Sequence, residues 1–101
     1  MCGIFAYLSS SPEDIVKLKA EGMKCKHRGP DSTKDLCIHN EKSFIYFLFH
    51  RLAINGLNEK SNQPMKLSTN ENNILICNGE IYNFKELANE FDIQLETDSD
   101  C

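Results

Sequence analysis

The second residue of the chain, Cys2, stands directly behind the start methionine. Methionine is normally removed when the next residue is small, and its removal would leave Cys2 with both a thiol and a free α-amino group. A thiol is a strong nucleophile, and an α-amino group with an ordinary pKa of about 7.7–8.0 is partly unprotonated at neutral pH. Cys2 would then carry a nucleophile and a base on one residue, as in N-terminal-nucleophile hydrolases. The alternative is a small core residue.

A second candidate site is the segment Asn78-Gly79-Glu80, which lies between a predicted strand and a predicted helix. A side-chain amide and a glycine N–H that point at one spot can form an oxyanion hole. Asn-Gly is also the commonest dipeptide of tight hairpin turns. Taken alone, the motif therefore favours a turn.

Charged residues near the ends of predicted elements could bind the charged groups of a small molecule. Arg51 lies near the end of an apolar strand, where its head could reach solvent or its planar fork could bind a carboxylate. The acidic residues Glu96, Asp98 and Asp100 are typical of a solvated loop. One of these carboxylates could instead bind an ammonium group.

Two Cys-x-His pairs, Cys25 with His27 and Cys37 with His39, could together supply four zinc ligands. Their spacing is not that of the usual zinc fingers or ribbons, and the first pair falls at a predicted helix end. A structural zinc site is therefore a minor alternative.

The elements that must position these residues are of mixed type. Apolar, aromatic and β-branched runs predict strands at 2–8, 35–39, 43–54, 73–77 and 93–96, of which 2–8 and 73–77 are expected to be buried. Helices are predicted from Pro12 to about Lys26, with Ser11 as N-cap, and from about 83 to 91, with a capping box of Asn83 and Glu86. Residues 27–31 and 55–64 are predicted loops. Neighbouring strands covered by helices predict one small α+β domain.

Composition excludes several classes of partner. Eleven basic and 15 acidic residues give a formal net charge of −4 and no basic stripe, so we expect neither nucleic acid nor a membrane as partner. No signal peptide is recognisable, and no apolar run approaches the ~20 residues needed to span a bilayer. The five cysteines, odd in number and scattered, favour thiols in a reducing cytoplasm.

Five segments together resemble class II glutamine amidotransferases, and most closely the glutaminase domain of glutamine-hydrolysing asparagine synthetases. They are MCGIFAYL at 1–8, HRGPD at 27–31, HRLAINGLNEKSNQPM at 50–65, NGEIYNFKEL at 78–87 and SDC at 99–101. They cover nearly the whole chain and follow the family's order.

The resemblance implies a role for each matching residue. Cys2 would be the nucleophile, and the Asn78 side chain and the Gly79 N–H would form the oxyanion hole. Arg51 would bind the α-carboxylate of L-glutamine. The other implied pocket residues are Leu52, Ala53, Ile54 and Asn55 beside Arg51, and Glu80 and Asp100 at the substrate ammonium group. The HRGPD loop would border the site without a direct chemical role.

The resemblance also implies a fold and a function. The fold would be the N-terminal part of a four-layer αββα sandwich with antiparallel sheets, of the N-terminal-nucleophile hydrolase type. The function would be hydrolysis of L-glutamine to glutamate and ammonia, for the ATP-dependent amidation of aspartate to asparagine. No cofactor or metal is expected in this chain, because ATP and Mg²⁺ would belong to a synthetase domain or partner chain. The sequence is therefore expected to be an N-terminal portion, and the alternative is an inactive remnant or split-chain fragment that binds a partner.

Overall fold

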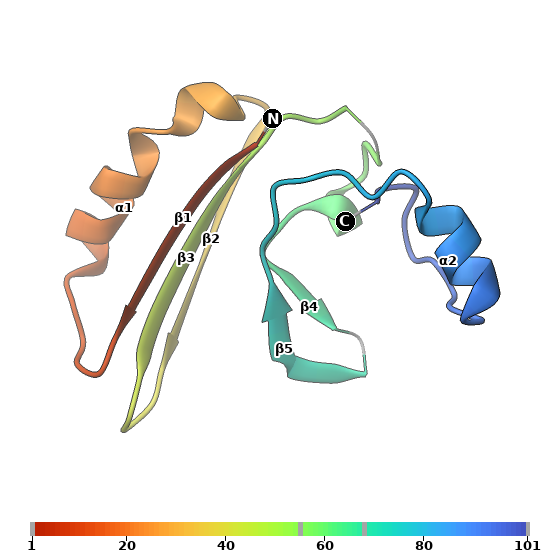
Figure 1. Cartoon of the computed structure of the whole chain (residues 1–101). Helices are drawn as coiled ribbons and strands as arrows, with labels where there is room; N and C mark the ends of the chain where they lie inside the picture. The colour runs from red at the N-terminus through yellow and green to blue at the C-terminus, as the bar shows by residue number, and fades with distance from the viewer. Residues whose placement is uncertain (1, 55, 68, 101) are drawn as a thin grey trace.

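The structure is a computed structural model that describes residues 2–54, 56–67 and 69–100. Figure 1 shows its elements in chain order. They are β1 (Gly3–Ser9), α1 (Ile15–Met23), β2 (Ser32–His39), β3 (Phe44–Arg51), β4 (Met65–Leu67), β5 (Asn70–Leu75) and α2 (Phe84–Glu90), with short 3-10 helices at Lys26–Arg28 and Glu59–Ser61.

The strands form two antiparallel sheets. β3 lies at the centre of the first sheet, between β1 and β2, and its register places His50 opposite Gly3 and Thr33. β4 and β5 form a separate hairpin with a register shift between Lys66 and Leu67. Antiparallel sheets with two helices make an α+β structure, as the order of elements predicted. In the described residues no helix is long and apolar enough to cross a membrane.

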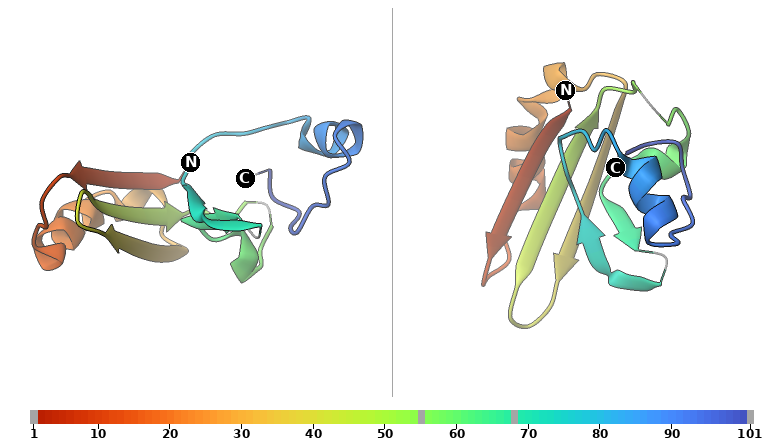
Figure 2. Two further views of the ribbon diagram at one scale, coloured as in Figure 1. Left: turned by 90° about the horizontal axis from the view of Figure 1, so that it is seen from below. Right: turned by 45° about the vertical axis from the view of Figure 1, so that its right-hand side comes forward.

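The core lies between α1 and one face of the three-stranded sheet, which Figure 2 shows from two further sides. Leu18 of α1 is buried against three residues of the central strand, Phe44, Tyr46 and Leu48. Phe5 packs edge-on against Tyr46, with ring centroids 6.3 Å apart. Because side chains alternate along a strand, this face uses every second residue of β3.

The opposite face of the same sheet is apolar but open. Ile4 and Leu8 of β1 point to this side and are 37% and 67% exposed. The prediction that residues 2–8 are buried is therefore wrong for this face, because among the described residues α1 covers the other one. The predicted burial of 73–77 is also wrong, since β5 is largely exposed.

Helix boundaries differ from the predicted ones because of local capping contacts. Asp14, not Ser11, caps α1: its carboxylate accepts from the N–H groups of Val16 and Lys17 at 2.9 and 3.4 Å. Ser11 is instead bonded to Ser9. At α2, Asn83 is the N-cap residue as predicted, but its side chain makes no capping hydrogen bond.

Two differences concern strands. β4 was not predicted, because three residues with a lysine in the middle carry no strand signal. The predicted strand 93–96 does not form, and these residues follow α2 as an irregular segment. β4 forms because β5 pairs with it, and residues 93–96 form no strand because no described strand pairs with them. In both cases the pairing partner outweighs the local propensity.

A polar cluster connects α1 to the sheet. The buried Tyr46 donates a hydrogen bond to Asp35 at 2.8 Å, and Lys19 forms an ion pair with the same carboxylate at 3.1 Å. Burial raises the pKa of the Asp35 carboxyl, but the bonds from Tyr46 and Lys19 and the charge of Lys19 outweigh it and hold the pKa below its usual value. Burial, reinforced by Asp35, raises the pKa of the Tyr46 phenol.

We expect Asp35→Asn to lower the free energy of unfolding at pH 7 by about 1 kcal/mol or less, because the ion pair is half-exposed. A depressed carboxyl pKa stabilises the fold above the ordinary carboxyl pKa, and this contribution is lost as the pH falls through the folded-state value. Urea unfolding from about pH 5 to about pH 3 should therefore show the variant converging on the wild type. Glu41→Gln, in an exposed turn, is the control. A difference that stays constant with pH would contradict the assignment.

Candidate active site

Cys2 lies immediately before β1, at the end of the sheet where β1 begins and β3 ends, beside the N label in Figure 1. Its thiol is held by the residue that follows β3: the Leu52 N–H donates to Sγ at 3.4 Å, and Sγ lies 3.8 Å from the Leu52 carbonyl oxygen. The next residue, Gly3, packs against buried His50, whose ring nitrogens contact Gly22 O at 3.0 Å and Thr33 Oγ1 at 2.8 Å. The start of β1 is therefore held by Leu52 at the Cys2 thiol and by His50 at Gly3.

The HRGPD segment, 27–31, holds the backbone around the thiol. Arg28 Nε donates to the Cys2 carbonyl at 3.2 Å, and the Asp31 carboxylate accepts from the Ala53 N–H at 2.7 Å. Gly29 lies so close to the backbone of His50 that a β-carbon would overlap its carbonyl group. The segment thus connects the backbone at Cys2, before β1, with the backbone at Ala53, after β3. These two contacts explain its position at the border of the site.

Asn78 contacts the Cys2 backbone across the gap between the two sheets. Its Oδ1 accepts from Cys2 N at 3.0 Å. This nitrogen becomes the α-amino group when Met1 is removed. Because an N–H can only donate, the amide oxygen must face Cys2, which leaves the Asn78 NH₂ group on the other arm of the planar amide, directed away from the Cys2 nitrogen. At Gly79 a β-carbon would meet no atom within 4 Å, so its backbone lies in open space.

Arg51 ends β3 and is 7% exposed. Its Nη1 donates to the Asn58 carbonyl at 3.0 Å and to Asn62 Oδ1 at 2.9 Å, and its Nη2 donates to the Gly56 carbonyl. Its guanidinium therefore organises the loop that follows β3, and Arg51 is also among the residues that line the cavity beside Cys2. Its predicted contact with a substrate carboxylate stays a prediction.

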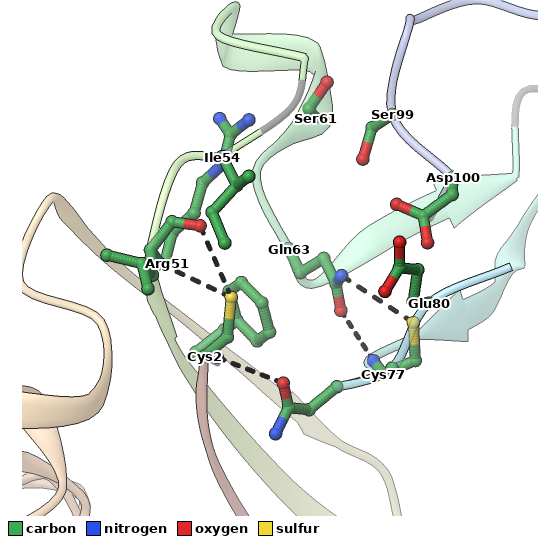
Figure 3. Close-up of a pocket in the computed structure, with 13 residues that line it drawn as sticks. Cys2, Arg51, Ile54, Ser61, Gln63, Cys77, Glu80, Ser99 and Asp100 are labelled. Atoms are coloured by element: carbon green, nitrogen blue, oxygen red, sulfur yellow. Dashed lines mark hydrogen bonds between the residues drawn. The ribbon is translucent and has the colours of Figure 1, made fainter. Parts of the chain in front are cut away.

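Two carboxylates, Glu80 and Asp100, lie on the opposite side of the cavity (Figure 3). Asp100 Oδ2 accepts from the Ile81 N–H at 2.7 Å, which connects the end of the described chain to the residue after Glu80. Two negative charges in one cavity wall would attract an ammonium group.

These residues surround one cavity of about 320 Å³, within the range of small-molecule sites. The predicted residues that line it are Cys2, Arg51, Leu52, Ile54, Asn78, Gly79, Glu80 and Asp100. Ala53 does not line it, and Asn55 lies outside the described residues. The lining residues not predicted are Phe49, Ser61, Gln63, Cys77 and Ser99. Gln63 falls in the predicted loop 55–64 and in the matching segment 50–65, but neither of these assigned it to a cavity.

The zinc alternative is not supported by the structure. Among the described residues, no three of His, Cys, Asp or Glu lie close enough to hold a metal ion. Cys25 lies after α1, and its thiol donates to the Gly22 carbonyl. Cys37 and His39 lie on β2, so the two pairs belong to different elements.

The sequence matches the model of the glutamine amidotransferase domain over residues 1–101, and the chain belongs to this family. It is 39% identical over 106 residues to asparagine synthetase 1 (glutamine-hydrolysing) of Saccharomyces cerevisiae, covering 100% of this chain and 17% of that protein. It is 38% identical over 103 residues to a probable glutamine-hydrolysing asparagine synthetase of Acanthamoeba polyphaga mimivirus, covering 100% of this chain and 18% of that protein. The chicken asparagine synthetase is 37% identical over 103 residues, covering 96% and 17%. The chain therefore spans about a sixth of the length of these relatives.

Proposed function

We propose that this chain forms the glutamine-hydrolysing site of an asparagine synthetase, with Cys2 as nucleophile. One observation supports the proposal above the others. A single cavity contains the Cys2 thiol, a cationic Arg51 on one side and the carboxylates of Glu80 and Asp100 on the other, as Figure 3 shows. Asn78 bonds to the nitrogen of Cys2 at the edge of the same cavity.

The charges of this cavity are complementary to a free α-amino acid. L-Glutamine carries a carboxylate and an ammonium group on its α-carbon, so a specific pocket needs a cation for one and an anion for the other. Arg51 would bind the carboxylate, and Glu80 with Asp100 would bind the ammonium group. With both charged groups held, the side-chain amide would extend toward Cys2.

The chemistry follows from the groups around Cys2. The thiol sulfur forms a bond to the amide carbon, and its proton passes to the α-amino group. The oxyanion of the tetrahedral intermediate would accept hydrogen bonds from the Asn78 NH₂ group and the Gly79 N–H. The carbon–nitrogen bond then breaks, and the α-ammonium proton leaves with ammonia. Water next attacks the γ-glutamyl thioester, which releases glutamate and restores the thiol.

The ammonia would serve the amidation of aspartate to asparagine, and the names of the relatives, which are glutamine-hydrolysing asparagine synthetases, support asparagine as the product. That step requires a synthetase domain or partner chain, to which we assign ATP and Mg²⁺, and we assign no cofactor to the present residues. We also place the sheet of β1, β2 and β3 in a four-layer αββα sandwich, whose second sheet would cover the open face at Ile4 and Leu8. We expect the protein to work in the cytoplasm.

The direct test is release of glutamate from L-glutamine by the full chain after removal of Met1. We expect turnover that saturates with L-glutamine, because both ends of the substrate have a charged partner. D-Glutamine should be a poor substrate, since it exchanges the positions of the carboxylate and ammonium groups relative to the side chain. Absence of glutamate release from a folded, processed chain would contradict the proposal for the isolated 101 residues.

A second candidate function is binding of a partner chain without turnover. The half-open apolar sheet face, with Leu8 67% exposed, favours it. The two candidates differ in the same assay: a folded chain that binds a synthetase chain but releases no glutamate, alone or with that partner, would favour the second one.

A further inference from the structure

Gln63 is a buried amide in the wall of the cavity, and none of the roles above uses it. It lines the same cavity as Cys2 and Asn78, yet it is only 4% exposed. Burial of a primary amide costs free energy unless the group is hydrogen-bonded. The partners of Gln63 therefore indicate what it does.

Both ends of the Gln63 amide face one residue, Cys77 (Figure 3). Oε1 accepts from the Cys77 N–H at 2.6 Å, and Nε2 lies 3.9 Å from Cys77 Sγ. β5 ends at Leu75, so Cys77 has already left the strand ladder. A partly buried backbone N–H beyond a ladder needs another acceptor. The Gln63 side chain supplies this acceptor across 14 residues of sequence.

This contact acts on the two residues that follow. Asn78 comes directly after Cys77, and its Oδ1 is the acceptor for Cys2 N. We propose that Gln63 is a positioning residue for the oxyanion hole: by holding the Cys77 N–H, it fixes the Asn78 amide and the Gly79 N–H relative to the Cys2 thiol. The inference rests on the proposed glutaminase function.

Gln63 also connects this segment to the loop after β3. Arg51 donates to Gly56, Asn58 and Asn62 along the 56–63 loop, and Gln63, at the end of this loop, accepts from the Cys77 N–H. The carboxylate-binding and oxyanion-binding parts of the site therefore share one backbone segment. The acceptor that Gln63 supplies is bonded to Cys77, next to Asn78, whereas Asp100 is bonded to Ile81. Loss of this acceptor should therefore change the geometry at the oxyanion hole more than the grip on the substrate's charged groups.

The test compares Gln63→Met with the wild type, using the full chain without Met1. Methionine keeps the length and volume of the side chain but removes the acceptor for the Cys77 N–H. We expect kcat for glutamine hydrolysis to fall roughly ten- to a hundred-fold while KM changes less than about twofold, as for a misplaced oxyanion donor. Gln94→Met, at an exposed position, is the matched control and should leave both constants unchanged.

Two further measurements separate positioning from loss of folded protein. The unfolding transition of each variant, followed by circular dichroism, gives the fraction of folded chains and so counts competent sites without using the oxyanion hole, and rates are expressed per competent site. The second measurement is affinity for a glutamine analogue with an aldehyde in place of the amide. The thiol adds across this carbonyl, and the resulting oxygen occupies the oxyanion position. Its affinity should fall by the same factor as kcat/KM, while the affinity for L-glutamate stays unchanged.

The outcomes are distinct. The positioning role would be overturned if Gln63→Met kept the wild-type kcat and analogue affinity. It would also be overturned if the fall in kcat were fully explained by a smaller number of competent sites. If the wild type binds the aldehyde analogue but does not release glutamate, the proposed function fails, and the ratio of analogue affinities still decides the role of Gln63. A wild type that does not bind the analogue would overturn both.

Discussion

Cys2→Ala is expected to lower glutamine hydrolysis by more than about 10³-fold, because it removes the only atom proposed to form a bond with the substrate. Alanine is as small as cysteine, so removal of Met1 should still occur. Leu52 holds the thiol by its backbone alone, and the fold should therefore tolerate the change. The measurement is glutamate release under saturating L-glutamine, with the melting temperature as a check on folding.

Binding should survive this substitution. Arg51, Glu80 and Asp100 are unchanged, so L-glutamine should still raise the melting temperature of Cys2→Ala. Cys37→Ala is the matched control, since Cys37 is an exposed cysteine on β2, and it should keep the wild-type rate. Turnover by Cys2→Ala at the wild-type rate would show that the nucleophile has been assigned wrongly.

Gly29→Ala is expected to destabilise the fold by about 1–3 kcal/mol, equivalent to a fall in melting temperature of roughly 5–20 °C. The added methyl group would overlap the backbone of His50 and Arg51, which cannot rotate away as a side chain could. Any relief must move β3 or the HRGPD segment, and both hold the backbone around Cys2. Thermal unfolding and the glutaminase rate should therefore decline together.

The matched control for this prediction is Gly79→Ala. The same change of residue at Gly79 meets no atom within 4 Å, so the melting temperature should stay at the wild-type value. Equal melting temperatures for Gly29→Ala and the wild type would contradict the packing at the HRGPD segment.

Residue types and local patterns were sufficient to predict several features. The strong apolar run at 43–54 became β3, the central strand, and residues 2–8 became β1, paired with it along the whole length. Cys2, Arg51 and Asn78 were recognisable as candidates from their chemistry and from the resemblance, and the structure places all three around one cavity. These features depend on residues close in sequence, so they could be read without the fold.

Other features depend on which backbone groups lack a partner after the strands have paired. Ser11 and Asp14 are both good capping residues, and only the path of the chain after β1 decides that Asp14 caps α1. Strand 93–96 had the right composition but found no strand to pair with among the described residues. Gln63 lies in a predicted loop, and its contact with Cys77 appears only in the structure. There β5 ends at Leu75, and the Cys77 N–H beyond it donates to the Gln63 side chain.

The sequence by itself supplied the proposed reacting group, a cysteine at position 2 with a nitrogen that can become an α-amine, together with an arginine, an amide and two carboxylates as candidate binding groups. The tertiary structure decided how they are held. It placed the Cys2 nitrogen 3.0 Å from Asn78. The HRGPD segment bonds to the backbone of Cys2, and Gln63 bonds to the backbone of Cys77, next to Asn78. The physical reason is that chemistry belongs to single side chains, whereas hydrogen-bond partners 14 to 76 residues apart exist only once the chain has folded.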